Sequence, residues 1–168
     1  MARSSGWDGV ACRRLETPWH DALSLFSFAG AWAPPEGRVA AGWGAWDGEQ
    51  LAGALLAERA GRAWLFHGPV VVAPPDAAPD GAVDVAGRLV ADALGQAEAD
   101  GIETVFTRPQ GLDRVWVRSG FIPLPEVELP KALRDRPGLG LFGWRGGTAL
   151  WSSAGRGASR ARPAPARS

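Results

Sequence analysis

The stretch that decides the fold is residues 63–101, AWLFHGPVVVAPPDAAPDGAVDVAGRLVADALGQAEADG. It opens with aromatic and β-branched runs over residues 63–73, which are typical of a buried strand. Prolines then interrupt the strand, because proline has no N–H for a β-ladder, and Gly81 allows a turn. From Val83 onward, apolar residues recur mostly at intervals of three and four, which predicts an amphipathic helix that ends at Asp100-Gly101.

A strand that runs through a loop into the start of a helix is a common place to bind an anion. The N–H groups of the first helical turn have no partner within the helix, and the helix dipole is positive at that end. The same joint can also be purely structural. Both interpretations stay open on these residues alone.

Length and charge limit the classes of function. The chain has 168 residues, enough for one domain with its own core. It has 18 basic and 18 acidic residues, but the tail after Trp151 holds four arginines and no acid. Residues 10–151 are therefore mildly acidic, with 13 bases against 17 acids. We expect neither nucleic acid nor an anionic membrane to be the main partner.

Cysteine and hydropathy patterns point to a cytoplasmic protein. Cys12 is the single cysteine, which excludes an internal disulfide and a metal site built on several thiolates, and no metal is expected. No segment approaches about 20 uninterrupted apolar residues, and no signal pattern opens the chain.

The first half of the chain is predicted to form a strand, a helix and a meander. A short strand is expected over residues 10–16, followed by a helix that Thr17 caps, with Pro18 at its first position, and that runs to about residue 28. Strands over residues 38–46 and 51–59 are joined at Asp47-Gly48, a strong hairpin signal. With residues 63–73 they complete a three-stranded meander.

After the long helix, a strand over residues 104–107 is expected to lie parallel to the one before it. A short helix follows at 112–119, then a proline-punctuated strand at 121–129 and a polar turn at 131–138. The last expected strand is 139–145, which residues 149–151 extend or supplement. The sequence thus predicts a loosely held segment 1–9, one domain over 10–151 and a disordered basic tail over 152–168.

This order of elements, with VWVRSGF at residues 115–121 and Val72-Ala73-Pro74, resembles the GNAT superfamily. Members of that superfamily move an acetyl group from coenzyme A to an amine. The resemblance covers about residues 10–145. It implies a single α/β (α+β) domain with a mixed central sheet, an antiparallel meander, a crossover helix and splayed central strands.

The resemblance also implies where coenzyme A, as acetyl-CoA, binds. The pantetheine arm would lie beside the central strand, residues 67–72, where Gly68-Pro69 suits a β-bulge. The pyrophosphate would lie at the start of the long helix, residues 81–86. The implied cofactor-binding residues are Val70, Val71, Val72, Gly81, Ala82, Asp84, Ala86, Arg88 and Trp116.

The helix-start loop departs from the family pattern. The family has an Arg or Gln and then glycines spaced two apart, whereas this loop has only Gly81 and Gly87 as glycines. Three aspartates, at positions 76, 80 and 84, add negative charge, which would repel a pyrophosphate. The pattern is that of a degenerate pyrophosphate loop, in which Arg88 is the one nearby basic residue.

Candidate acid and base groups come from the same comparison. Trp116 stands where the family often has a tyrosine, and an indole N–H does not supply a proton at neutral pH. His67 is the first candidate for the general base and Glu58 the second, although a structural histidine is equally compatible with the pattern. Glu126 and Glu128, two apart on an expected strand, would hold a cationic acceptor, or else are exposed polar residues.

The functional hypothesis is an N-acyltransferase that moves an acetyl group from coenzyme A to an amine of a small molecule or peptide. Two alternatives remain. One is a non-catalytic GNAT-fold module for binding or homodimerisation. The other is an acyltransferase that uses a donor other than coenzyme A, such as an aminoacyl group.

Overall fold

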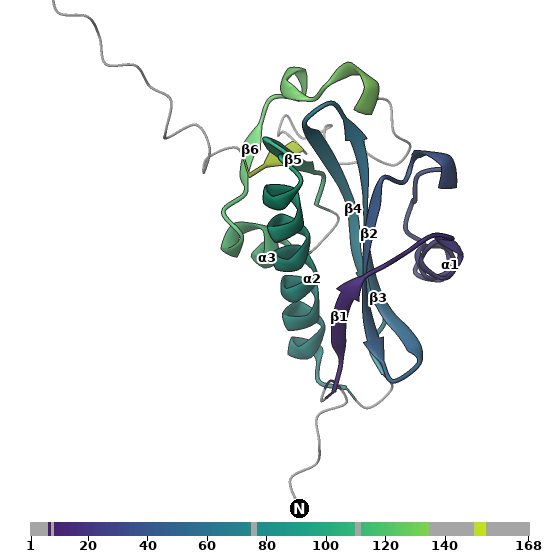
Figure 1. The fold of residues 1–168 in the computed structure, drawn as a ribbon. Coiled ribbons are helices and arrows are strands. Elements are labelled where there is room, and N and C mark those ends of the chain that lie inside the picture. Colours follow the sequence, from purple (N-terminus) through teal and green to yellow (C-terminus); the bar gives the residue numbers. More distant parts are fainter. Residues whose placement is uncertain (1–6, 8, 75–76, 110–111, 135–149, 154–168) are drawn as a thin grey trace, which may run out of the picture.

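The computed structural model describes residues 7, 9–74, 77–109, 112–134 and 150–153, in which a mixed sheet lies between helices (Figure 1). The sheet has seven strands in the order β1-β2-β3-β4-β5-β7-β6. The strands are β1 (Ala11–Arg14), β2 (Ala41–Asp47), β3 (Gln50–Ala60), β4 (Ala63–Val71), β5 (Thr104–Thr107), β6 (Ile122–Leu124) and β7 (Leu150–Ser152). The α-helices are α1 (His20–Phe28), α2 (Pro79–Ala99) and α3 (Asp113–Arg118), and the 3-10 helices are η1 (Glu36–Arg38), η2 (Glu126–Glu128) and η3 (Lys131–Leu133).

The predicted meander is confirmed. Strands β2, β3 and β4 pair antiparallel in chain order, and β1 pairs with the outer side of β2. Asp47 pairs with Gln50, so the β2–β3 turn has two residues, and its first, Gly48, has φ +60°. Glycine suits this turn because it adopts positive φ without a side-chain clash.

The predicted crossover is also confirmed. Helix α2 connects β4 to β5, which pair in parallel from Ala63↔Thr104 to Phe66↔Thr107. Strand β5 ends there, whereas β4 continues to Val71, paired among the described residues with β3 alone. The central strands therefore splay after Phe66.

The largest part of the core lies between the sheet and α2. Apolar residues of α2 pack against large side chains of β2 and β4, including Trp43, Trp64 and Phe66. Burying one such side chain contributes about 1.5–3 kcal/mol. On the opposite face, α1 packs Phe26 against Leu56 and Val70. Figure 1 shows α1 and α2 on opposite sides of the sheet.

A β-bulge interrupts β4 at Gly68-Pro69, as predicted. Ala54 pairs with Val70 and Leu56 with His67, so the two bulge residues oppose a single residue of β3. Gly68 has φ +92°, and the Gly68–Pro69 peptide bond is cis. Because the bulge adds one residue, His67 and Val70 lie on the same face of the sheet although they are three positions apart.

Both long helices begin elsewhere than predicted. Helix α1 starts at His20, not at Pro18, because the buried Trp19 packs with Ala22 and Phe26 and its carbonyl accepts the first helical bond. Helix α2 starts at Pro79, so this proline opens the helix instead of belonging to the loop. Proline suits the first helical position because the N–H that it lacks would be unpaired there.

The C-terminal half differs most from the prediction. Residues 121–129 form the short strand β6 and then η2, which begins directly after Pro125, and not one strand. The expected strand 139–145 lies outside the described residues. Strand β7 instead inserts between β5 and β6 and includes Ser152, which is buried. Within segment 1–9, expected to be loosely held, Trp7 is 8 % exposed.

Candidate functional site

A cavity of about 360 Å³ opens where β4 and β5 splay. One wall is residues 65–71 of β4, and another is residues 29–32, which follow α1. The remaining lining residues are Ala82 of α2, Trp116 of α3, Arg108 after β5 and Leu112. The cavity therefore lies where the resemblance placed the arm of the cofactor.

The two predicted catalytic residues are in contact. His67 Nε2 lies 2.8 Å from Glu58 Oε2, and the residues are 5 % and 2 % exposed. The register explains the contact, because Leu56 pairs with His67 and Glu58 pairs with Leu65, so Glu58 and His67 are diagonal neighbours on one face. The edge of Trp32 packs against the imidazole, with ring centroids 5.2 Å apart.

The contact with Glu58 uses one ring nitrogen of His67. His67 lines the cavity, whereas Glu58 does not. When Nε2–H donates to the Glu58 carboxylate, the imidazole is held in one tautomer. Nδ1 then carries the lone pair and is the nitrogen that can accept a proton from a bound molecule.

Four of the predicted cofactor residues come together at the cavity: Val70, Val71, Ala82 and Trp116. Beyond Phe66 the β5-facing edge of β4 has no strand partner among the described residues. Free N–H and C=O groups on a strand edge can pair with an extended ligand. Val72 lies just past β4 and outside the cavity lining, and its N–H donates to the Ala52 carbonyl.

The start of α2 is covered by the N-terminal segment. The indole of Trp7 packs so closely on Gly81 that a Cβ there would lie 1.8 Å from its Cδ1. Trp7 Nε1 also donates to the Ala78 carbonyl at 2.8 Å. Arg88, the expected compensating cation, donates from Nη1 to the Val10 carbonyl at 2.9 Å.

The other two predicted residues of this helix do not meet the cavity either. Asp84 is exposed on the surface of α2, and Ala86 is buried in the core beneath the helix. The described residues therefore fit the acyl and pantetheine end of coenzyme A. They do not fit its diphosphate at the start of α2.

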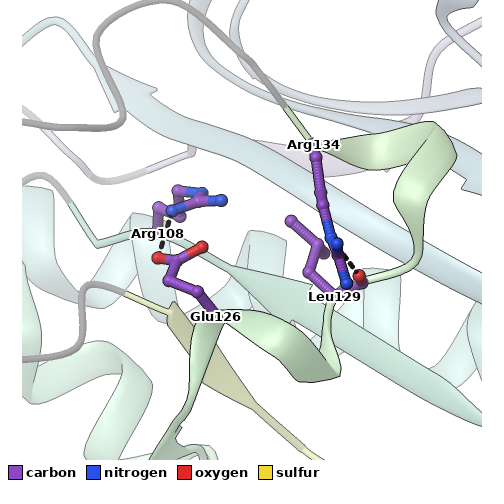
Figure 2. A network of polar contacts seen from close by, with 4 residues as sticks. All are labelled: Arg108, Glu126, Leu129 and Arg134. Carbon is purple, nitrogen blue, oxygen red and sulfur yellow. Dashed lines mark hydrogen bonds and ion pairs between the residues drawn. The ribbon is translucent and has the colours of Figure 1, made fainter.

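The two glutamates expected to bind a cationic acceptor do not form a paired site. They lie on η2 and not on one face of a strand. Glu126 accepts a hydrogen bond from Arg108 Nη1 at 2.5 Å (Figure 2). Glu128 is exposed and does not line the cavity.

Arg108 and Trp32 are cavity residues that the sequence reading missed. The Arg108 side chain is only 9 % exposed. A signal for it existed, because it directly follows a predicted parallel strand, and ligands bind at the carboxyl ends of parallel strands. Trp32 lies in an irregular segment that gave no such signal.

Cys12 lies on β1 and has no part in the cavity. Burial raises the pKa of its thiol above the usual value, although the Arg88 guanidinium acts in the opposite direction. The thiol therefore stays protonated at neutral pH, which makes it a poor nucleophile.

The described residues contain no group of three or more His, Cys, Asp and Glu side chains placed to hold a metal ion. No helix within them is long and apolar enough to cross a membrane.

Comparison by sequence gave no relative. No family model matches the chain, and no curated protein matches it.

Solved structures are similar in fold. An acetyltransferase of the GNAT family from Staphylococcus aureus Mu50 has a TM-score of 0.61 and 7% identity, over 86% of this chain and 98% of that one. N-acetylglutamate synthase from Neisseria gonorrhoeae has a TM-score of 0.58 and 15% identity, over 85% of this chain and 34% of that longer one. The ribosomal-protein-S18-alanine N-acetyltransferase from Escherichia coli has a TM-score of 0.54 and 16% identity, over 69% of this chain and 79% of that one.

Proposed function

We propose that this chain, which has the GNAT fold predicted from its sequence, is an N-acyltransferase. Its reaction would move an acetyl group from coenzyme A to an amine of a small molecule or peptide. The observation that carries the proposal is the buried Glu58–His67 pair on the wall of a cavity at the splay of β4 and β5. The synthase from Neisseria gonorrhoeae, similar in fold, is described in complex with coenzyme A.

Binding would use the strand end of the site. Acetyl-CoA supplies the acyl group as an activated thioester. The β5-facing edge of β4, with Val70 and Val71, offers backbone groups to the amides of an extended arm. Trp116 and Ala82 close the cavity on the helix side. Holding both reactants in one cavity lowers the barrier by removing the entropy of their encounter.

His67 would act as the general base. As the amine nitrogen forms its bond to the acyl carbon, it must lose a proton, and His67 Nδ1 accepts that proton. Glu58 stabilises the resulting imidazolium through its bond to Nε2. The thiolate that leaves takes a proton from water, because the indole of Trp116 cannot donate one at neutral pH.

The first test is a thermal shift with acetyl-CoA and with coenzyme A. A ligand that binds only the native state raises Tm by mass action. We expect a rise in Tm with both ligands, followed by release of free thiol when a panel of amines is added. No shift at millimolar ligand would contradict the coenzyme A proposal.

A different acyl donor is the second candidate, and the start of α2 favours it. Trp7 covers Gly81, and Arg88 is bonded to Val10, so the diphosphate of coenzyme A lacks the backbone and cation that would bind it. An acyl donor without a diphosphate needs neither free backbone groups nor a cation at the start of α2. A non-catalytic module that dimerises remains the third candidate, and it predicts neither thiol release nor an effect of His67 on any reaction.

A further inference from the structure

We infer that the acceptor carries a carboxylate as well as an amine, and that Arg108 binds the carboxylate. The acceptor would then be an amino acid or a compound that resembles one. Its role as acceptor rests on the proposed function, whereas the carboxylate site rests on Arg108 alone. Three observations lead to it: the position of Arg108, its unused donors and the chemistry of the cavity wall.

Arg108 and His67 lie on the same face of the sheet at the splay. Leu65 pairs with Phe106, and both contribute to one apolar cluster. Side chains alternate along a strand, so His67 and Arg108, each two residues further on, point to that same face. Both line the same cavity. A molecule bound there can contact both side chains.

Arg108 has donors that the described residues leave unused. Its Nη1 donates to Glu126, but its buried Nε has no partner, and Nη2 bonds to no described residue. The buried Nε is not open to the cavity, so a carboxylate bound there would accept a charge-assisted hydrogen bond at the Nη2 edge of the guanidinium.

Glu126 does not satisfy this edge because it is held elsewhere. Its side chain is 51 % exposed and belongs to η2. Arg134 fixes that segment by donating to the carbonyls of Leu129 and Val127, and Figure 2 shows Arg134 and Arg108 at separate positions along it. Glu126 therefore orients the guanidinium through Nη1 and leaves Nη2 without a partner among the described residues.

The rest of the wall selects the remaining chemistry of the ligand. Arg108 and His67 are the ionisable side chains among the described residues that line the cavity. Around them lie apolar groups, including Trp32, Leu65 and Val70. A zwitterion brings one positive and one negative charge, so its binding leaves the net charge of the cavity unchanged. An amino acid with an apolar side chain fits this combination.

The test compares matched ligands that differ only in the carboxylate. L-phenylalanine and L-leucine are titrated against the full chain beside their amides, with binding read as a thermal shift. We expect the free acids to bind at least about tenfold more tightly than the amides, because the amide has no charge for Arg108. Equal binding of acid and amide, or no binding of the acids, would overturn the inference.

Variants of Arg108 test whether this side chain causes the preference for the free acid over the amide. In Arg108→Gln the preference for the acid should disappear, and in Arg108→Lys it should shrink, since lysine keeps the charge but has no guanidinium. Arg114→Gln removes an exposed arginine of α3 that does not line the cavity, and it should keep the preference. An unchanged preference in Arg108→Gln contradicts the proposed site. If Arg108→Gln does not fold, the acid and amide pair on the native chain still decides.

A separate titration with acetyl-CoA keeps the two proposals apart. If the acids bind through Arg108 but acetyl-CoA does not bind, the coenzyme A proposal fails and the carboxylate site stands. If acetyl groups are transferred equally well to amines with and without a carboxylate, the carboxylate inference fails and the acyltransferase stands. If Arg108→Gln weakens acetyl-CoA and not the acids, Arg108 serves the donor, and the inference is wrong.

Discussion

The carboxyl end of β4 and the amino end of α2 are joined by a short connection, yet their surroundings differ. At the strand end, β4 separates from β5, and its edge, His67 and Arg108 face a cavity. At the helix end, the chain's own Trp7 covers Gly81. The first region offers unused donors to a ligand, whereas the second has filled the corresponding space with protein.

The two halves of the proposed binding site depend on different elements of the fold. The acyl end depends on strand pairing and on side chains from β3, β4 and the end of β5. The diphosphate end depends on a few N–H groups and the space in front of them. At that end, the indole of Trp7 packs on Gly81 and donates to the Ala78 carbonyl. The predictions below test each half, from the largest expected effect to the smallest.

The largest effect is expected from His67→Ala. Removing a general base typically lowers turnover by about 10²–10⁴-fold. Binding of the donor, measured by thermal shift, should change little, because β4 supplies its contacts through the backbone. His20→Ala, at the exposed start of α1, is the matched control. Turnover within about twofold of the native chain would remove His67 from its role.

Glu58→Gln tests whether the buried carboxylate acts through His67. The amide keeps the shape but cannot stabilise an imidazolium, and we expect turnover to fall by about 10–100-fold. In a chain that already carries His67→Ala, adding Glu58→Gln should lower turnover only slightly further, because the two residues act as one unit. Kinetics of the two single variants and the double variant measure this. Fully additive losses would show that Glu58 acts independently.

The bulge is tested by Gly68→Ala, with Gly95→Ala in α2 as a control. The two substitutions should change the free energy of unfolding in opposite directions. Gly68 has φ +92°, and a Cβ there would lie 3.0 Å from the Ala54 carbonyl oxygen, so Gly68→Ala should lower the free energy of unfolding by at least about 1–2 kcal/mol. Gly95, inside α2, has open space around its Cα, and Gly95→Ala should raise it by about 0.5–1 kcal/mol. Urea denaturation measures both. A stable Gly68→Ala protein would mean that the bulge does not require glycine.

The smallest effect is expected at the helix end. Because Trp7 covers the start of α2, the diphosphate part of acetyl-CoA should add little, and acetyl-pantetheine should bind within about tenfold of acetyl-CoA, a difference below about 1.4 kcal/mol. Trp7→Ala should widen this gap in favour of acetyl-CoA, since it uncovers the first-turn N–H groups. Trp46→Ala removes an indole from β2 and should leave the gap unchanged. A large gap in the native chain would show that the start of α2 still binds the diphosphate.

The meander, the crossover and the bulge were predictable because local signals carry them. Aromatic and β-branched runs, the three- and four-residue spacing of α2 and the Asp47-Gly48 turn each act within a few residues. His67 and Glu58 were predicted on neighbouring strands as alternative bases, whereas their contact depends on the register of those strands. The sequence could not set their distance or burial.

Other features depend on contacts that are distant in the sequence. Residues 149–151 were expected to extend or supplement a strand, but the place of β7 between β5 and β6 is set by pairing, which no local pattern marks. Residues 126–128 alternate like a strand, but Pro125 and Pro130 limit the ladder and η2 forms instead. Trp7 meets Gly81 across more than 70 residues. The occlusion of the helix start was therefore invisible in the sequence.

The bulge in β4 also sets how this strand can change in evolution. His67 before the bulge and Val70 after it face the same side of the sheet, and Val71 faces the α2 core. Deleting either Gly68 or Pro69 would leave one residue opposite Leu55, so Val70 would still pair with Ala54 and the later residues of β4 would keep their faces. A deletion at any regular position of the strand would instead turn the residues beyond it to the opposite face. An alignment with distant relatives should place its gap at residues 68–69 and nowhere else in the strand.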